Sequence, residues 1–254
     1  MADSQSFRQT LASGQLVWGP FLVSPDPLAA EAMARIDCDA VCIDMEHGPF
    51  SRMDASTCIA AVQRAGHAAI VRVAENRPQL IGDAFDRGAD AVLCPHVSDA
   101  AAAQALAAAA RYSGHRGFSG ATRAAGYGAT GMNALIGRED GRVAVIAQIE
   151  DAEAVENADA ICAVDGIDCI FIGRSDLTVS MGLTDRNDPR VTDAVAHVAS
   201  LATKAGKSVG TFTTDLDEIP HWRSQGINLF LLGSSLGFMV AGGNAMARRL
   251  RGEG

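Results

Sequence analysis

The sequence has few basic residues and no long apolar run, and both absences narrow the possible functions. Lys and Arg total 21 against 30 for Asp and Glu, so the formal net charge is −9, and no basic cluster interrupts this balance. A surface that follows nucleic-acid phosphates needs such a cluster, so we expect no nucleic-acid partner. No apolar run is long enough to span a bilayer, and the opening segment MADSQSFRQT lacks a basic stretch followed by an apolar one. We therefore expect a soluble, cytoplasmic protein without membrane association.

Paired CxxC spacings are also absent from the sequence. The six cysteines lie inside or beside apolar runs, at Cys38, Cys42, Cys58, Cys94, Cys162 and Cys169. This distribution predicts reduced, buried thiols rather than a disulfide framework.

Short runs of β-branched and apolar residues recur along the whole chain. They predict eight strands, at Leu16–Val23, Ala40–Met45, Ala69–Val73, Ala91–Cys94, Val143–Ile149, Cys169–Ile172, Ser208–Phe212 and Asn228–Leu232. Runs that are apolar on both faces are typical of a parallel sheet covered by helices. The segments between them predict helices, for example at Asp99–Arg111 and Asp193–Ala205. Strands and helices therefore alternate throughout.

The organisation of the chain favours a single α/β domain over residues 1–254. No linker rich in Pro, Gly or Ser divides it, and Asp26-Pro27 and Ser51 with Asp54 are typical of helix starts. Eight strand–helix units in one domain predict a (β/α)8 TIM barrel, with a doubly wound open sheet as the alternative. The one long stretch without periodicity, Ser113–Gly137, is expected to be a mobile loop over the barrel mouth. Within it, Arg116 and Arg123 are either solvated or within reach of a substrate carboxylate.

Polar side chains appear where the apolar runs stop, which is where a barrel carries its active site. The second run ends in Asp44, Glu46 and His47, the third carries Arg72, the fifth ends in Gln148 and Glu150, and the sixth ends in Gly173, Arg174, Ser175 and Asp176. We expect these side chains to meet at one mouth.

Glu150 and Asp176 are the predicted metal ligands. Two carboxylates on adjacent strands, with few other protein ligands, suit a hard divalent cation that keeps water or substrate oxygens in its coordination shell. Either residue alone would more commonly be a solvated or helix-capping carboxylate. Their shared position at strand ends favours the metal site.

Two further residues have open interpretations on the sequence alone. His47 suits a general base, a metal ligand or a packing residue. Arg72 lies between Val71 and Val73, so we expect it to be buried against an anion, either a substrate oxyanion or a neighbouring carboxylate. His96 also lies at a strand end and is a candidate for lining the site, although a lone histidine is more commonly structural.

Six segments together resemble the class II pyruvate aldolases of the HpcH/HpaI family. They are DMEHG at Asp44–Gly48, VRVAEN around Arg72, FDRGAD at Phe85–Asp90, HRGFSG at His115–Gly120, QIED at Gln148–Asp151 and FIGRSDL at Phe171–Leu177. The resemblance covers most of the chain, in order and with similar spacings. It implies a divalent-metal-dependent carbon–carbon lyase that cleaves or forms 4-hydroxy-2-oxo acids from pyruvate or hydroxypyruvate and an aldehyde. Relatives include 4-hydroxy-2-oxoheptanedioate aldolase and 2-dehydro-3-deoxyglucarate aldolase.

The resemblance also implies roles for individual residues. Glu150 and Asp176 would bind Mg, Mn or Co, and Arg72 would contact the C2 oxygen of pyruvate. His47 would pair with Asp86 on the following helix for proton transfer, and Asp44 would support catalysis. Substrate binding would involve Arg72 and Gln148, with the backbone amides of Ser175 and Asp176 on the carboxylate. A homohexamer with exchanged C-terminal helices is implied as well, and the apolar tail Leu236–Met246 is compatible with it.

Departures from the family pattern leave the second substrate open. Phe21 stands where some relatives have tryptophan, Arg174 replaces a frequent proline, and Gly233–Ser235 lacks an aspartate. The alternatives are an acyl-CoA lyase or an oxaloacetate decarboxylase on the same site, and a non-catalytic ligand-binding barrel. The absence of a basic surface for CoA phosphates counts against the acyl-CoA lyase. The non-catalytic barrel is disfavoured because the polar residues at the strand ends are all present: Asp44, Glu46, His47, Arg72, Glu150 and Asp176.

Overall fold

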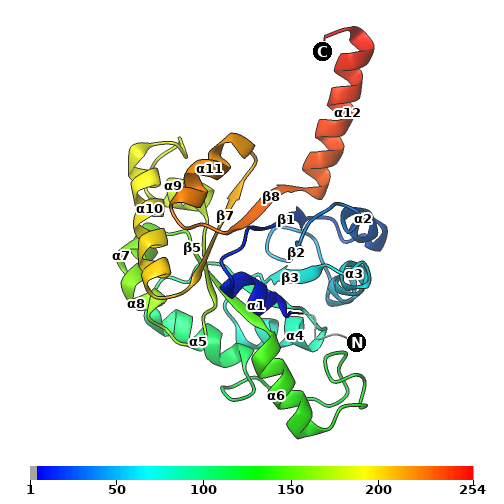
Figure 1. The fold of residues 1–254 in the computed structure, drawn as a ribbon. Helices are drawn as coiled ribbons and strands as arrows, with labels where there is room; N and C mark the ends of the chain where they lie inside the picture. The colour runs from blue at the N-terminus through cyan, green and yellow to red at the C-terminus, as the bar shows by residue number, and fades with distance from the viewer. Residues whose placement is uncertain (1–4, 254) are drawn as a thin grey trace.

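Eight parallel strands close into a barrel in the order in which they occur in the chain. The computed structural model describes residues 5–253, and Figure 1 shows the barrel with its surrounding helices. The strands are β1 (Val17–Leu22), β2 (Ala40–Asp44), β3 (Ala68–Arg72), β4 (Ala91–Cys94), β5 (Ala144–Ile149), β6 (Cys169–Ile172), β7 (Ser208–Thr213) and β8 (Leu229–Ser234). Each predicted strand is present within two residues of its predicted ends, so the (β/α)8 barrel is confirmed and the open sheet is excluded.

Helices follow the strands in regular alternation. They are α1 (Phe7–Ala12), α2 (Pro27–Met33), α3 (Arg52–Arg64), α4 (Pro78–Asp86), α5 (Ala100–Ala110), α6 (Met132–Arg142), α7 (Ala152–Glu156), α8 (Ala158–Cys162), α9 (Arg174–Ser180), α10 (Pro189–Lys204), the 3-10 turn η1 (Leu216–Glu218), α11 (Ile219–Ser224) and α12 (Ser235–Arg251). The predicted helix starts are confirmed: Asp26 caps α2, and Ser51 and Asp54 form a reciprocal capping box at α3.

The core has two layers, which follow from the two-residue period of a strand. One set of side chains fills the barrel interior, including Cys42, Ile70 and Ile146. The alternate set packs between the sheet and the helices, including Ile43 and Val71. Phe7 and Leu11 of α1 join the interior set and close the barrel at its amino-terminal end. All six cysteines are free and buried, as predicted, and burial is the main cause that raises the pKa of thiols such as Cys38, to about 11.

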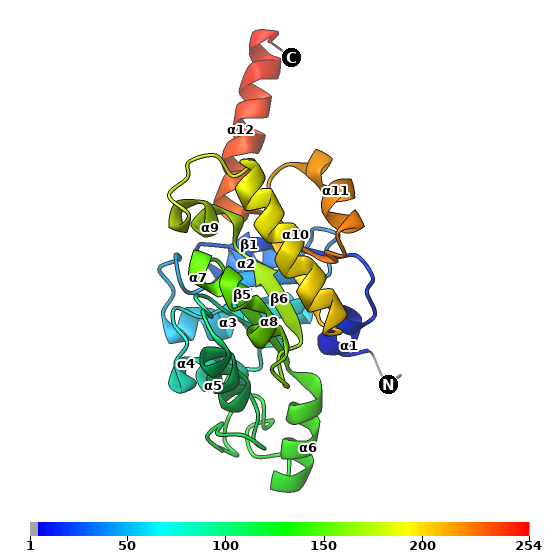
Figure 2. The same ribbon diagram turned by 90° about the vertical axis from the view of Figure 1, so that its left-hand side faces the viewer.

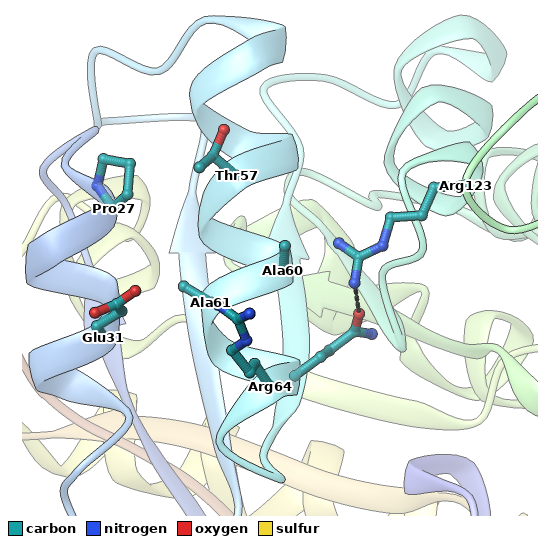
Figure 3. Close-up of a pocket in the computed structure, with 8 residues that line it drawn as sticks. Pro27, Glu31, Thr57, Ala60, Ala61, Arg64 and Arg123 are labelled. Carbon is teal, nitrogen blue, oxygen red and sulfur yellow. Dashed lines mark hydrogen bonds between the residues drawn. The ribbon is translucent and has the colours of Figure 1, made fainter. Parts of the chain in front are cut away.

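The prediction of a mobile loop at Ser113–Gly137 over the barrel mouth is wrong. The segment connects α5 to β5, so it lies at the amino-terminal end of the strands, opposite the mouth (Figure 2). Its last residues belong to α6, which begins at Met132. Arg123 therefore lies away from the mouth of its own barrel. It donates a hydrogen bond to Gln63 of α3 (3.0 Å), beside a hollow between α2 and α3 on the outer surface (Figure 3).

The final helix, α12, projects away from the barrel as an isolated rod (Figures 1 and 2). Of its side chains only Ser235 is buried. Exposed apolar side chains lie along it at Leu236, Phe238, Met239, Val240, Met246 and Leu250. Among residues 5–253, no helix combines the length and the apolar character needed to cross a lipid bilayer.

Candidate active site

A cavity of about 390 Å³ opens at the carboxyl ends of the strands. Most of the residues predicted for the site line it. The lining consists of Phe21, Val23, Asp44, His47, Arg72, Gln148, Phe171, Gly173, Arg174, Ser175, Asp176, Phe212 and Ser234. The predicted convergence of the strand ends on one mouth is therefore present in the fold.

A buried ion pair between Arg72 and Asp44 forms the floor of this cavity. The two residues are register partners on β3 and β2, so their side chains enter the barrel at the same height. The Arg72 guanidinium donates from Nε to Asp44 Oδ1 (2.9 Å) and from Nη2 to Oδ2 (2.6 Å). Its third nitrogen, Nη1, lies 3.3 Å from Glu46 Oε2, and Phe21 packs against its plane at 4.7 Å. Burial opposes the charge, but the Asp44 carboxylate outweighs burial and raises the pKa of Arg72.

Glu150 lies buried directly after β5, with an exposed fraction of 2%. Its Oε1 accepts a hydrogen bond from the main-chain N–H of His96 (2.9 Å), and its Oε2 accepts one from Gln148. Burial is the largest cause that raises the pKa of Glu150, and the charge of Asp176 adds to it. Gly173 packs so closely that a methyl group there would lie 2.7 Å from Glu150 Oε2. A carboxylate confined in this way is stabilised by an adjacent cation.

The donor groups around Glu150 fit a divalent cation. Glu46, His96 and Glu150 each offer a donor atom, and these atoms lie within 4.8 Å of one another. Gln148 Oε1 is buried without a hydrogen-bond partner in the part of the chain that the structure describes, and Glu46 Oε2 has only the ion pair with Arg72. Asp176, the other predicted ligand, is exposed on the cavity wall and does not belong to this cluster. Glu46 was expected at the mouth but not as a metal ligand, and His96 was only a candidate for lining the site.

One chain does not bring His47 and Asp86 together. The His47 side chain is 65% exposed at the mouth, and its nearest carboxylate is that of Glu46, 4.0 Å away. Asp86 ends α4, which runs antiparallel to the strands, so it lies toward the opposite end of the barrel. There it accepts a hydrogen bond from the buried Arg116 (2.9 Å), so Arg116 is not solvated, and it lies away from the cavity of its own chain.

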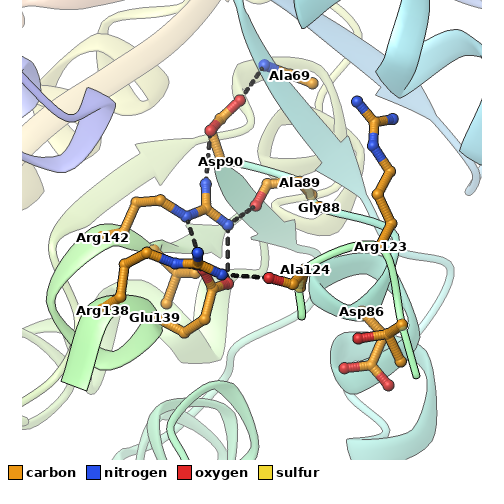
Figure 4. A network of polar contacts seen from close by, with 12 residues as sticks. Ala69, Asp86, Gly88, Ala89, Asp90, Arg123, Ala124, Arg138, Glu139 and Arg142 are labelled. Atoms are coloured by element: carbon orange, nitrogen blue, oxygen red, sulfur yellow. Dashed lines mark hydrogen bonds and ion pairs between the residues drawn. The ribbon is translucent and has the colours of Figure 1, made fainter. Parts of the chain in front are cut away.

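The surroundings of Asp86 form a polar network with α6 (Figure 4). The main-chain oxygen of Asp86 accepts from Ala124, whose own carbonyl accepts from Arg138. Arg142 donates to Asp90 at 2.6 Å, at the start of β4. These contacts hold the connection between α5 and β5 against the amino-terminal end of the barrel.

Two of the residues that depart from the family pattern, Arg174 and Phe21, have structural partners. Arg174 is buried over Trp222 at 4.6 Å and pairs with Glu218 at 2.5 Å. Burial opposes ionisation of Glu218, but the hydrogen bonds from Arg174 and Thr213 outweigh burial and lower the pKa of Glu218 to about 2. This pair ties the start of α9 to the connection that follows β7. Phe21 supports Arg72, as described above.

Comparison with known proteins agrees with the geometry of the site. Residues 18–241 match the family described as HpcH/HpaI aldolase/citrate lyase. The chain belongs to this family. The predictions of the family and of an aldolase, a carbon–carbon lyase, are confirmed.

Two relatives and one solved structure each match three quarters or more of this chain. A hydroxypyruvate/pyruvate aldolase of Rhizorhabdus wittichii is 39% identical over 197 residues, which is 76% of this chain and 77% of that protein. A 5-keto-4-deoxy-D-glucarate aldolase of Shigella boydii is 31% identical over 91% of this chain and 90% of its own length. The crystal structure of an HpcH/HpaI aldolase/citrate lyase family protein from Burkholderia cenocepacia superposes with a TM-score of 0.90, at 30% identity, covering 96% of this chain and 98% of that one.

The buried pair predicts a large stability effect when one partner is removed. Asp44→Ala removes the doubly hydrogen-bonded partner of the buried Arg72 and leaves only Glu46, 3.3 Å from Nη1, so we expect the free energy of unfolding to fall by about 3 kcal/mol in urea titrations. The double variant Asp44→Ala/Arg72→Met should recover part of that loss. As a matched control, Glu75→Ala breaks the exposed Glu75–Arg77 pair and should cost about 0–1 kcal/mol. Equal losses in Asp44→Ala and Glu75→Ala would show that the buried pair does not support the fold.

Proposed function

We propose that this enzyme forms and cleaves the carbon–carbon bond of 4-hydroxy-2-oxo acids, with pyruvate or hydroxypyruvate as the donor, an aldehyde as the acceptor and a divalent cation as cofactor. The observation that carries this proposal is the position of the Arg72 guanidinium. It is held by Asp44 at the cavity floor and joined through Glu46 to the cluster around Glu150. The printed names of the relatives in Rhizorhabdus wittichii and Shigella boydii support the same substrate class.

In cleavage, the proton of the C4 hydroxyl is removed and the C3–C4 bond breaks. The aldehyde leaves, and the electron pair of the bond passes into an enolate whose negative charge lies on the C2 oxygen. Arg72 is the proposed donor to this oxygen, because a fixed cation in an apolar setting stabilises charge where it develops. Protonation at C3 then gives the 2-oxo acid. A bound divalent cation supplies Lewis-acid polarisation of substrate oxygens.

The remaining residues of the predicted site have positioning roles in this proposal. Glu150 and Asp176 hold the cation, which the family resemblance implies as Mg, Mn or Co. The main-chain N–H groups of Ser175 and Asp176 hold the substrate carboxylate at the start of α9, where Gly173 has no side chain to cap them. Gln148 lines the cavity beside Glu150 and faces the same ligand.

Assembly into a homo-oligomer completes the proposal. The exposed apolar side chains of α12 would be covered if this helix packs on a neighbouring copy, and the resemblance implies a hexamer. The proposed pairing of His47 with Asp86 then joins two copies, because one chain keeps the two residues at opposite ends of the barrel. The cytoplasmic location stays a prediction from the sequence.

Activity should depend on a cation held by Glu150. Chelation should abolish turnover of pyruvate with an aldehyde, and Mg, Mn or Co should restore it. Glu150→Gln removes the buried negative charge, so restoration should fail in this variant, whereas Glu153→Gln, on the exposed face of α7, should respond like the unaltered enzyme. Full turnover after chelation, or trapping of a Schiff base by borohydride and pyruvate, would overturn the metal mechanism. The lysines Lys204 and Lys207 do not lie at a carboxyl strand end, so no Schiff base is expected.

Proton transfer by His47 should be separable from binding. His47→Ala leaves the chelating groups intact, so metal and pyruvate affinity should persist while the rate falls by roughly 10²–10⁴. Exchange of the pyruvate methyl protons with D2O, followed by NMR, reports enolisation without an aldehyde. His197→Ala, exposed on α10, is the matched control. Unaltered exchange in the His47 variant would remove this residue from enolisation.

A further inference from the structure

A buried arginine begins the segment that carries the proposed contacts to the substrate carboxylate and the cation. Arg174 is the first residue of α9 and directly precedes Ser175 and Asp176. Its side chain is 2% exposed, and its Nε atom has no hydrogen-bond partner among residues 5–253. An unpaired buried donor costs free energy, and a buried ion pair adds little net stability in compensation. Stability alone therefore does not account for this arginine.

The guanidinium of Arg174 links the start of α9 to other elements at the rim of the barrel. Nη1 donates to Glu218 Oε2 at 2.5 Å, and the group lies 4.6 Å over the ring of Trp222. Nη2 donates to Asn187 Oδ1 at 3.2 Å. Glu218 Oε2 also accepts from Thr213 at 2.9 Å, at the end of β7. The start of α9 is therefore joined to β7, to the turn η1, to α11 and to the loop before α10.

The start of α9 lacks the usual local support. Its N-cap residue is Gly173, which has no side chain and so cannot cap the helix. A larger residue is disfavoured there, because a methyl group at position 173 would lie 2.7 Å from Glu150 Oε2. The helix spans only the seven residues Arg174–Ser180, and a helix this short is not stable in isolation. Its position therefore depends on contacts with other elements, and Arg174 makes such contacts at the first residue.

The residue type at position 174 supports this interpretation. Arg174 replaces a proline that is frequent in the family pattern, at the first position of the helix. A proline ring at this position fixes φ near about −65° and so prepares the chain for the helix. Arginine has no such ring. In this chain, the pair with Glu218 supplies the constraint that a proline ring would supply.

We propose that Arg174 is a positioning residue, whose pair with Glu218 holds Ser175 and Asp176 in place against the substrate carboxylate and the cation. This inference rests on the proposed function, which assigns those contacts to Ser175 and Asp176. The charges of Arg174 and Glu218 balance each other, so the pair acts through geometry rather than through a net charge. Both contacts depend on the same segment, so loss of the pair weakens them together.

Arg174→Ala separates positioning from a charge effect. The measurements are calorimetric affinities, without an aldehyde, of the chelator-treated protein for Mn²⁺ and of the Mn²⁺-loaded protein for pyruvate. We expect both affinities to fall by about tenfold or more, because Ser175 and Asp176 shift together. A charge effect would give opposite signs, since loss of a positive charge weakens pyruvate binding but strengthens Mn²⁺ binding.

Arg174→Pro is the rescue variant. Proline lacks the charge, as alanine does, but its ring restores the constraint at the helix start, so both affinities should stay within about threefold of those of the unaltered protein. Arg190→Ala is the matched control, because it breaks the pair between the exposed Arg190 and Asp188 at the start of α10. Both affinities should be unaltered in this control.

Glu218→Gln tests the pair from the other side, and it carries the test if urea titration shows that Arg174→Ala does not fold. Both affinities should fall by about threefold or more, because an uncharged acceptor holds the guanidinium less firmly. A charge effect would instead strengthen pyruvate binding.

Three results would overturn the inference: unaltered affinities in folded Arg174→Ala, opposite changes of the two affinities in either variant, or equal losses in Arg174→Pro and Arg174→Ala. In each of these cases the unaltered protein still binds Mn²⁺ and pyruvate, so the proposed function stands. If the unaltered protein binds neither, the proposed function fails and this inference fails with it.

Discussion

The guanidinium of Arg72 and the carboxylate of Asp44 meet as a buried, doubly hydrogen-bonded pair where β3 and β2 end. Because the pair lies directly above an apolar barrel interior, its charges are screened weakly and act strongly on neighbouring groups. Asp44 uses two guanidinium nitrogens and leaves the third toward Glu46. The orientation of Glu46 therefore depends on the pair. Because Glu46 lies beside Glu150, the arrangement of donor atoms around Glu150 depends on the pair as well. Without Asp44, the Arg72 guanidinium would lose its fixed orientation, and Glu46 would then lose the contact that orients it.

The barrel was predictable because its strands are apolar on both faces, a pattern that only a covered parallel sheet requires. The same alternation explains the site. Cys42 and Ile70 point into the barrel. Asp44 and Arg72 lie two residues further along the same strands, so their polar side chains point inward as well. The ends of the strands locate the mouth, and this parity decides which side chains enter it. Applied to β5, parity places Gln148 and Glu150 on the same inward face.

Three features were not predictable by that reasoning. The helix α6 contains Gly137 and Gly141, which weaken its helical signal, so its sequence resembled a loop. Its place at the amino-terminal end follows from chain order, since it joins a helix to the next strand. The pairing of Asp86 with His47 was implied by the family resemblance, and a resemblance does not show whether two paired residues belong to the same chain. The orientation of His96 depends on a backbone angle that no local sequence pattern specifies.

In the proposed mechanism, Arg72 stabilises charge on the substrate as well as pairing with Asp44. Arg72→Lys tests this most directly, because lysine keeps the charge but loses the planar fork that engages Asp44 and a substrate oxygen together. The measurement is exchange of the pyruvate methyl protons with D2O in the metal-loaded variant, with folding checked by urea titration. We expect the exchange rate to fall by roughly a hundredfold or more in a folded protein. An unchanged exchange rate in a folded Arg72→Lys variant would contradict it.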